Sequence, residues 1–158
     1  MIGVPSDFSD PFWKCAQIIE TLEGGYAHDP ADHGGDTMEG ITQVTYDKWR
    51  DALGLPHAPV RGISDDDVNA IYYNWYWLGN GCDQLAWPLS LVHFDSVVNM
   101  SPYWWKQCLL AARGDWKAYL DKRRLCYQQI AAKDPTQAKF LPIWLKRCDT
   151  IYGDAEAA

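Results

Sequence analysis

The sequence lacks several features that identify whole classes of proteins. No run reaches the roughly 18 consecutive apolar residues of a transmembrane helix, so we expect no stable membrane insertion. Residues 1–10 contain neither a basic segment nor an apolar stretch, so no secretory signal peptide is predicted. Positive charge is scarce: 14 Lys and Arg stand against 21 Asp and Glu, and the net charge of −7 argues against nucleic acid as a partner.

The cysteines also lack the spacing of a cross-linked or metal-binding protein. There are five, an odd number, and no two form a CxxC pair. They are Cys15, Cys82, Cys108, Cys126 and Cys148. We therefore expect reduced, mostly buried cysteines rather than disulfides or a zinc site, and no cofactor is predicted.

What the sequence does contain is a large supply of aromatic residues, with nine Trp and nine Tyr. Aromatic faces are broad apolar surfaces on which the C–H face of a sugar ring can stack. Charge is unevenly spread as well, because residues 105–150 carry ten Lys and Arg against four Asp, a net charge of +6. This basic stretch fits either an anionic polymer such as a cell wall or a set of solvated helix surfaces.

Apolar residues recur mostly at helical spacing, which predicts a mainly α fold with at most a small β-hairpin or sheet. The predicted helices cover residues 11–22, 44–53, 64–77, 89–98, 103–112, 116–132 and 139–152. Ser9 or Asp10 can cap the first helix, and Pro11 suits its first position. Residues 153–158 are expected to form a loose tail.

Glu23 occupies an unusual position, the end of the first predicted helix. The negative end of a helix dipole disfavours a carboxylate there, and Lys or Arg is the ordinary choice. Glycoside hydrolysis needs a carboxyl group that stays protonated and can protonate the leaving oxygen. Glu23 is therefore the candidate catalytic acid, with an ordinary solvent-exposed Glu before a glycine stop as the alternative.

The polar segment 26–40 supplies candidates for a second carboxylate. Four acidic residues lie in it: Asp29, Asp32, Asp36 and Glu39. Each of them could instead form the turn hydrogen bonds typical of Asp, and the segment matches no standard metal-ligand pattern. Asp32 follows Glu23 by nine residues and Thr37 follows five later, an order that resembles the catalytic triad of phage-type lysozymes.

Several blocks of sequence together resemble glycoside hydrolase family 108, a family of N-acetylmuramidases that are largely phage endolysins. The first blocks are Glu23-Gly24-Gly25-Tyr26, Asp29-Pro30-Ala31-Asp32, Gly34-Gly35-Asp36-Thr37 and Gly40-Ile41-Thr42. The later ones are Ile71-Tyr72 through Tyr76-Trp77, Cys82-Asp83, Phe94-Asp95-Ser96-Val97-Val98-Asn99, and a weaker C-terminal set that includes Arg123, Tyr127, Trp144 and Arg147. The chain departs from the family pattern at Met38-Glu39, Met100-Ser101-Pro102 and Pro142-Ile143.

The resemblance implies a lysozyme-like fold with two lobes around a cleft, and cleavage between N-acetylmuramic acid and N-acetylglucosamine. It implies that Glu23 is the proton donor, and we expect Asp32, aided by Thr37, to steady the transition state or direct water. Because Glu39 departs from the family pattern inside the cleft, it is an extra acid and the alternative second carboxylate.

A single domain over residues 1–158 is predicted. Residues 10–100 would form its catalytic part around the loop 23–42, and residues 101–152 a helical part that resembles a peptidoglycan-binding segment.

Four residues are candidate substrate contacts: Tyr26, Glu39, Trp77 and Asn99. For Tyr26, loop packing is an equal alternative, and Trp side chains are more often core than sugar platforms. Asn99 shares a helix face with Asp95, so it could bind an acetamido group or belong to a polar pair that ties two helices together.

Three functions compete at this point. The leading hypothesis is a monomeric muramidase that acts on peptidoglycan glycan strands. As an endolysin it would wait in the host cytoplasm until a separate membrane-permeabilising protein gives it access to the periplasm and cell wall. A lytic transglycosylase, which leaves 1,6-anhydro ends, and a non-catalytic cell-wall-binding or virion protein are the alternatives. The Glu–Asp–Thr set favours the hydrolase.

Overall fold

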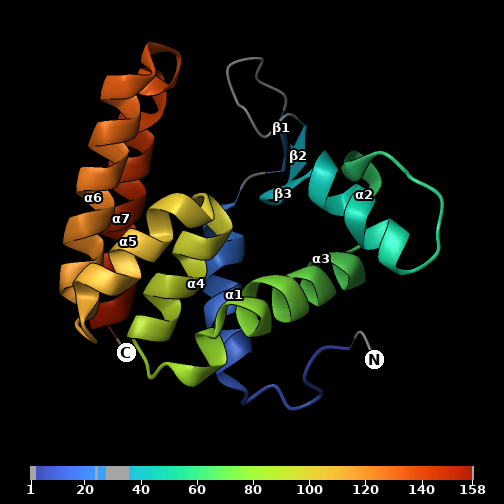
Figure 1. The fold of residues 1–158 in the computed structure, drawn as a ribbon. Coiled ribbons are helices and arrows are strands. Elements are labelled where there is room, and N and C mark those ends of the chain that lie inside the picture. Colours follow the sequence, from blue (N-terminus) through green and yellow to red (C-terminus); the bar gives the residue numbers. More distant parts are fainter. Residues whose placement is uncertain (1–2, 24, 28–35, 158) are drawn as a thin grey trace. The chain divides into compact units, whose positions relative to one another are not determined.

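Helices account for most of the chain, and one small sheet is the only β structure in the part that the structure describes (Figure 1). The computed structural model describes residues 3–23, 25–27 and 36–157. The chain divides into two units, Met1–Gly79 and Asn80–Ala158. The mainly α fold with a small sheet is confirmed, whereas the single-domain organisation stays a prediction.

The first helix, α1, spans Pro11–Leu22, as the sequence predicts. The carboxylate of Asp10 caps it by accepting a hydrogen bond of 2.9 Å from the backbone N–H of Phe12, and Pro11 needs no donor at the first position. One face, which includes Phe12 and Ile19, is fully buried. The opposite face stays open to solvent, and Glu20 lies on it.

Three short antiparallel strands follow in the order β1-β2-β3. They are β1 (Tyr26–Ala27), β2 (Thr37–Met38) and β3 (Ile41–Thr42). Met38 pairs with Ile41, so only two residues connect β2 to β3. Thr42 then caps α2 (Gln43–Ala52), its hydroxyl accepting a 3.2 Å hydrogen bond from the backbone N–H of Thr45.

The last helical segments of the first unit contain the aromatic run. After a 3-10 turn, η1 (Val60–Gly62), Ser64 caps α3 (Asp65–Ile71) by accepting a 3.1 Å hydrogen bond from the backbone N–H of Asp67. The chain then widens into a π-helical turn, η2 (Tyr72–Trp77). Such turns are rare and are often found at functional sites.

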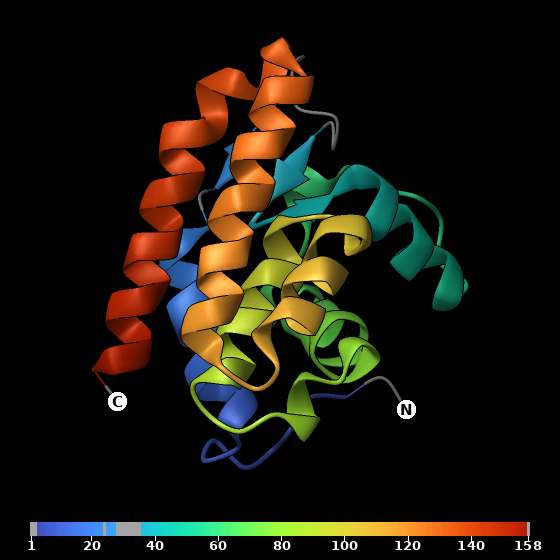
Figure 2. The ribbon, with the colours of Figure 1, turned by 60° about the vertical axis from the view of Figure 1, so that its left-hand side comes forward.

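The second unit is helical throughout its described residues. Its elements are η4 (Cys82–Gln84), α4 (Leu89–Asn99), α5 (Pro102–Ala112), α6 (Trp116–Lys133), η5 (Pro135–Phe140) and α7 (Leu141–Glu156), and η3 (Leu78–Asn80) precedes them at the boundary. The long helices α6 and α7 run side by side and in opposite directions (Figure 2).

Two predictions about side chains and ends have clear outcomes. All five cysteines are buried and free of disulfides, as expected. The loose tail predicted for residues 153–158 is wrong, because α7 continues to Glu156. Ala155 is buried and the backbone N–H of Ala157 bonds to the carbonyl of Gly153 at 3.1 Å, so the last turn has both packing and hydrogen bonds.

Candidate active site

The turn between β2 and β3 has an unusual backbone. Its two residues, Glu39 and Gly40, have φ angles of 51° and 78°. Positive φ at both central residues is the requirement of the tight hairpin turn that matches strand twist, and glycine meets it without strain. Glu39 does not have that freedom, and strained residues of this kind cluster at functional sites.

Glu23 lies directly against this turn. It ends α1 in an extended conformation, and its backbone N–H bonds to the carbonyl of Ile19 at 2.9 Å. A Cβ atom placed on Gly40 would lie 2.8 Å from Cδ and 2.9 Å from Oε2 of Glu23. The carboxyl group therefore packs over the bare backbone of Gly40, which must be glycine both for its φ angle and for this contact.

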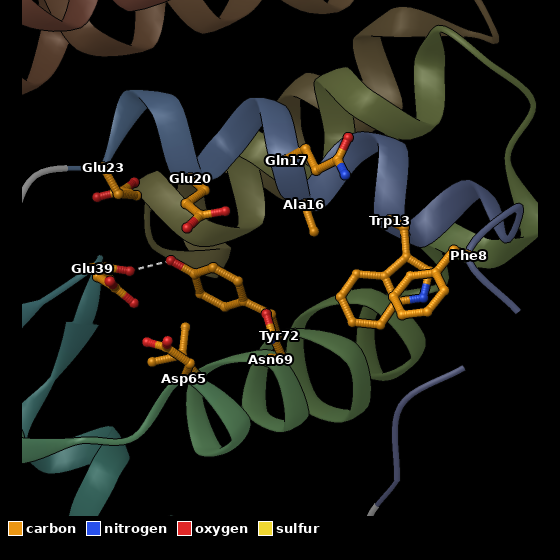
Figure 3. A pocket seen from close by; sticks show the side chains of 11 residues that line it. Phe8, Trp13, Ala16, Gln17, Glu20, Glu23, Glu39, Asp65, Asn69 and Tyr72 are labelled. Atoms are coloured by element: carbon orange, nitrogen blue, oxygen red, sulfur yellow. Dashed lines mark hydrogen bonds between the residues drawn. The ribbon is translucent and has the colours of Figure 1, made fainter. Parts of the chain in front are cut away.

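Two tyrosines of η2 lie near the Glu23 carboxyl group. The buried hydroxyl of Tyr72 donates a hydrogen bond to the backbone carbonyl of Glu39, which fixes the turn to η2 (Figure 3). Burial raises the pKa of Tyr76, a hydrogen bond with Thr45 partly offsets that rise, and the charge of Glu23 adds to it. The hydroxyl of Tyr76 therefore stays neutral near Glu23, and the hydroxyl of Tyr72 already acts as a hydrogen-bond donor.

A pocket of about 240 Å³ opens between α1 and α3 on this side of the unit (Figure 3). Four carboxylates lie at one end of it: Glu20, Glu23, Glu39 and Asp65. Among the described residues that line the pocket there is no Lys or Arg. The pocket lining therefore concentrates four carboxyl groups at one end.

This concentration of acids affects protonation. Burial raises the pKa of Glu39, and the neighbouring charges of Asp65 and Glu20 raise it further. A site of this kind favours keeping a proton on one of its carboxyl groups, which is the property that acid catalysis of glycoside cleavage requires.

The opposite end of the pocket is aromatic and polar but uncharged. Phe8 and Trp13 lie there, and the amide side chains of Gln17 and Asn69 line the space between the two ends (Figure 3). Ala16 and Val68 complete the lining with small or apolar surface.

The structure brings together two of the residues predicted from sequence, Glu23 and Glu39, at the acidic end. Thr37 lies half-buried in the central strand β2, paired with Ala27 and Thr42, and does not line the pocket. Tyr26 belongs to β1. Asp32, the predicted second carboxylate, lies outside the described residues.

The two remaining predicted contacts belong to packed regions. The sugar contact predicted for Trp77 is corrected, because its side chain is only 2 % exposed and packs edge-on against Phe12, with 5.9 Å between ring centroids. Asn99 lies in the second unit, where its side-chain oxygen accepts a hydrogen bond from the hydroxyl of Tyr127. That bond ties α4 to α6, which is the structural alternative considered for Asn99.

Sequence reasoning missed three residues of the acidic end, namely Glu20, Asp65 and the hydroxyl of Tyr72. Glu20 could have been found, because it precedes Glu23 by three residues and so shares its helix face. Asp65 resembles an ordinary acidic residue in the first turn of a helix, and only the tertiary fold brings it to Glu23.

Neither a metal nor a membrane site is found in the described part of the chain. No three His, Cys, Asp or Glu side chains in residues 3–23, 25–27 and 36–157 are arranged to hold a metal ion. Within the same residues, every helix is too short or too polar to span a lipid bilayer.

Comparisons with known proteins agree with this architecture. The structure of SagA from Brucella abortus is 21 % identical in sequence, covers 92 % of this chain and 94 % of its own, and superposes with a TM-score of 0.72, which shows a shared fold. No curated protein matches the sequence. Residues 16–101, more than half of the chain and including Glu23, Glu39 and Asp65, match the family Glycosyl hydrolase 108. The chain therefore belongs to glycosyl hydrolase family 108.

Proposed function

We propose that this glycosyl hydrolase cleaves the glycan of bacterial peptidoglycan, at the β-1,4 bond between N-acetylmuramic acid and N-acetylglucosamine. The observation that carries the proposal is the placement of Glu23. Its carboxyl group lies on Gly40 at the acidic end of a pocket whose far end is aromatic. Carboxyl groups are the groups that cleave glycosidic bonds, and aromatic rings offer an apolar surface on which sugar rings can stack.

In this proposal Glu23 donates its proton to the glycosidic oxygen of the leaving sugar. Gly40 lets the carboxyl group rest against the backbone in one position, and preorganisation of this kind is worth a large part of a catalytic effect. The hydroxyl of Tyr72 fixes the neighbouring turn by its hydrogen bond to the carbonyl of Glu39.

The second carboxylate has to be ionised, because it stabilises positive charge on the sugar or takes a proton from water. The raised pKa of Glu39 makes it a poor choice for that task. We therefore keep Asp32, aided by Thr37, as the second carboxylate, and propose that Glu39 contacts the substrate at the acidic end of the pocket.

Two substitutions separate these roles. Glu39→Gln keeps the size of a substrate contact and its ability to form hydrogen bonds, so it is expected to keep most of the wild-type kcat. Asp32→Asn removes a required charge and is expected to lower kcat by about 10²-fold or more. If instead Glu39→Gln abolishes turnover and Asp32→Asn does not, Glu39 is the second carboxylate.

The reaction itself is tested by the products of the wild-type protein. Purified cell walls are digested, and the soluble muropeptides are analysed by mass spectrometry. Hydrolysis leaves reducing N-acetylmuramic acid ends, the expected result. Anhydro ends would identify a lytic transglycosylase, and binding to walls without soluble products would identify a non-catalytic protein.

We further propose that the protein is a phage endolysin that lyses its host from within. Cytoplasmic expression alone should leave bacterial cultures intact, and co-expression with a membrane-permeabilising protein should make their turbidity fall. Lysis that is equally fast with Glu23→Gln under the same conditions would argue against this role.

A further inference from the structure

The aromatic end of the pocket is built by the segment that precedes and begins α1. The rings of Phe8 and Trp13 lie 5.4 Å apart between centroids and are tilted by 39°. Phe8 is 80 % exposed, which is unusual for a phenylalanine that has a fixed place against another ring. Both residues precede the part of the chain that matches the family, residues 16–101.

Hydrogen bonds hold this segment in place beside the pocket. The indole N–H of Trp13 donates to the backbone carbonyl of Pro5 at 3.1 Å, and the amide of Asn74 donates to the carbonyl of Gly3 at 3.1 Å. Next to Phe8, the carboxylate of Asp7 accepts hydrogen bonds from the backbone and the hydroxyl of Ser9, at 2.9 and 2.7 Å. The exposed ring of Phe8 is therefore presented by an ordered turn.

We propose that Phe8 and Trp13 form a saccharide subsite, which holds a sugar ring of the glycan at a distance from the bond that Glu23 cleaves. The rings offer an apolar surface for the C–H face of a sugar. The amides of Gln17 and Asn69, on the way to the acidic end, can bond its hydroxyl or acetamido groups (Figure 3). This inference rests on the proposed function, because it assigns the far end of the same pocket.

The geometry also explains why the two ends differ in charge. The acidic end has to protonate a bond, whereas a distant subsite only has to bind a sugar ring through its C–H face and its hydroxyl or acetamido groups, so it needs no carboxylate. Binding energy collected there helps long substrates more than short ones, because only a long chain can reach both ends of the pocket.

The test compares peptide-free glycan strands of bacterial peptidoglycan, separated by length, as substrates of the full chain. Phe8→Ala is expected to raise KM about tenfold for long strands, to leave kcat unchanged, and to change little for the shortest strands that are cut. Phe8→Trp keeps an aromatic face and should restore the wild-type KM. Leu110→Ala is the matched control, because Leu110 is also 80 % exposed but lies on α5 of the second unit.

The outcomes separate this inference from the proposed function. If Phe8→Ala has the same KM as wild type at every strand length, the subsite is disproved, but the proposed hydrolase activity is not. An equal loss with Leu110→Ala, or a loss in kcat at all lengths, also overturns it, because a general loss of structure would then explain the effect. If the wild type neither binds nor cuts any strand, the proposed function fails and the subsite fails with it.

Discussion

Both units of the chain contain a group of charged side chains built around carboxylates, but the surroundings of these carboxylates are opposite in charge. In the first unit, the pocket gathers Glu20, Glu23, Glu39 and Asp65, and none of its described lining residues is a cation. In the second unit, Asp95 is completely buried between two guanidinium groups. Arg123 lies 2.7 Å and Arg147 2.6 Å from its oxygens.

The opposite surroundings give opposite pKa shifts. Burial alone would raise the pKa of Asp95, but the charges of Arg147 and Arg123 outweigh burial and hold it below its ordinary value. Burial also raises the pKa of Glu39, but there the neighbouring charges of Asp65 and Glu20 raise it further instead of opposing it. A permanently charged Asp95 holds α4, α6 and α7 together. Acid catalysis instead needs a carboxyl group that can give up and take back a proton. The comparison therefore separates a structural carboxylate from the candidate catalytic ones.

The largest effect is expected from removing the charge of Asp95, the structural carboxylate of the second unit. Asp95→Asn leaves two guanidinium groups without their counter-charge, and we expect the free energy of unfolding to fall by about 3–5 kcal/mol. Denaturant unfolding measures this directly. Asp149→Asn is the matched control: Asp149 pairs with Arg124 at 2.6 Å on the surface, so its loss should cost at most about 1 kcal/mol. Equal losses for the two variants would contradict a structural role for the buried cluster.

A second prediction concerns the contact between Gly40 and Glu23. Gly40→Ala adds a methyl group 2.8 Å from Cδ of Glu23, and we expect the displaced carboxyl group to lower kcat by about 10²-fold. Gly54→Ala provides the control, because Gly54 has a similar φ of 69° but nothing within 4 Å of the added atom. Both variants carry comparable backbone strain of about 1–2 kcal/mol.

The two glycine variants therefore differ in what the added methyl group meets, which at Gly40 is the Glu23 carboxyl group and, at 3.1 Å, the hydroxyl of Tyr72. Stability measured by thermal unfolding should fall in both, while kcat should fall in Gly40→Ala alone. If the two variants lose kcat to the same degree, the position of Glu23 does not depend on Gly40.

The smallest expected effect is the pH dependence of the second unit's stability. His93 is fully buried, with its ring nitrogens 2.9 Å from the hydroxyl of Tyr119 and 3.0 Å from the carbonyl of Asn80. Burial lowers its pKa, and the carbonyl of Asn80 only partly opposes this. Below pH 6.5, the ordinary pKa of histidine, His93 therefore binds a proton in the unfolded chain but stays neutral in the folded chain.

His93 is therefore expected to cost up to about 1.4 kcal/mol of stability for each unit that the pH falls below its unfolded pKa, until the folded group titrates as well. The slope is measured as the change in the free energy of unfolding between about pH 7 and about pH 5. In His93→Gln the slope in that window should become shallower. An unchanged slope would show that other groups cause it.

Local signals in the sequence predicted a large part of this fold. Asp10 begins α1 as predicted, because its carboxylate accepts a hydrogen bond from the backbone N–H of Phe12, and such a signal needs no tertiary information. Thr42 and Ser64 cap α2 and α3 through the same kind of local bond. The position of Glu23 at the end of α1 followed from the same reasoning.

Contacts between distant segments were not predictable in this way. The packing of Glu23 on Gly40, the bond from Tyr72 to Glu39 and the place of Asp65 in the pocket depend on how α1, the turn and α3 come together. Trp77 was misjudged for a similar reason, because an aromatic run does not reveal which ring faces the core.

The central claim is that the carboxyl group of Glu23 performs the chemistry. Its most direct test is the rate of soluble glycan release from purified cell walls by wild type and by Glu23→Gln, which keeps the size of the side chain but removes the acid. We predict a loss of about 10²–10⁴-fold in rate with an unchanged thermal unfolding midpoint. Release at the wild-type rate by a folded Glu23→Gln protein would contradict the claim.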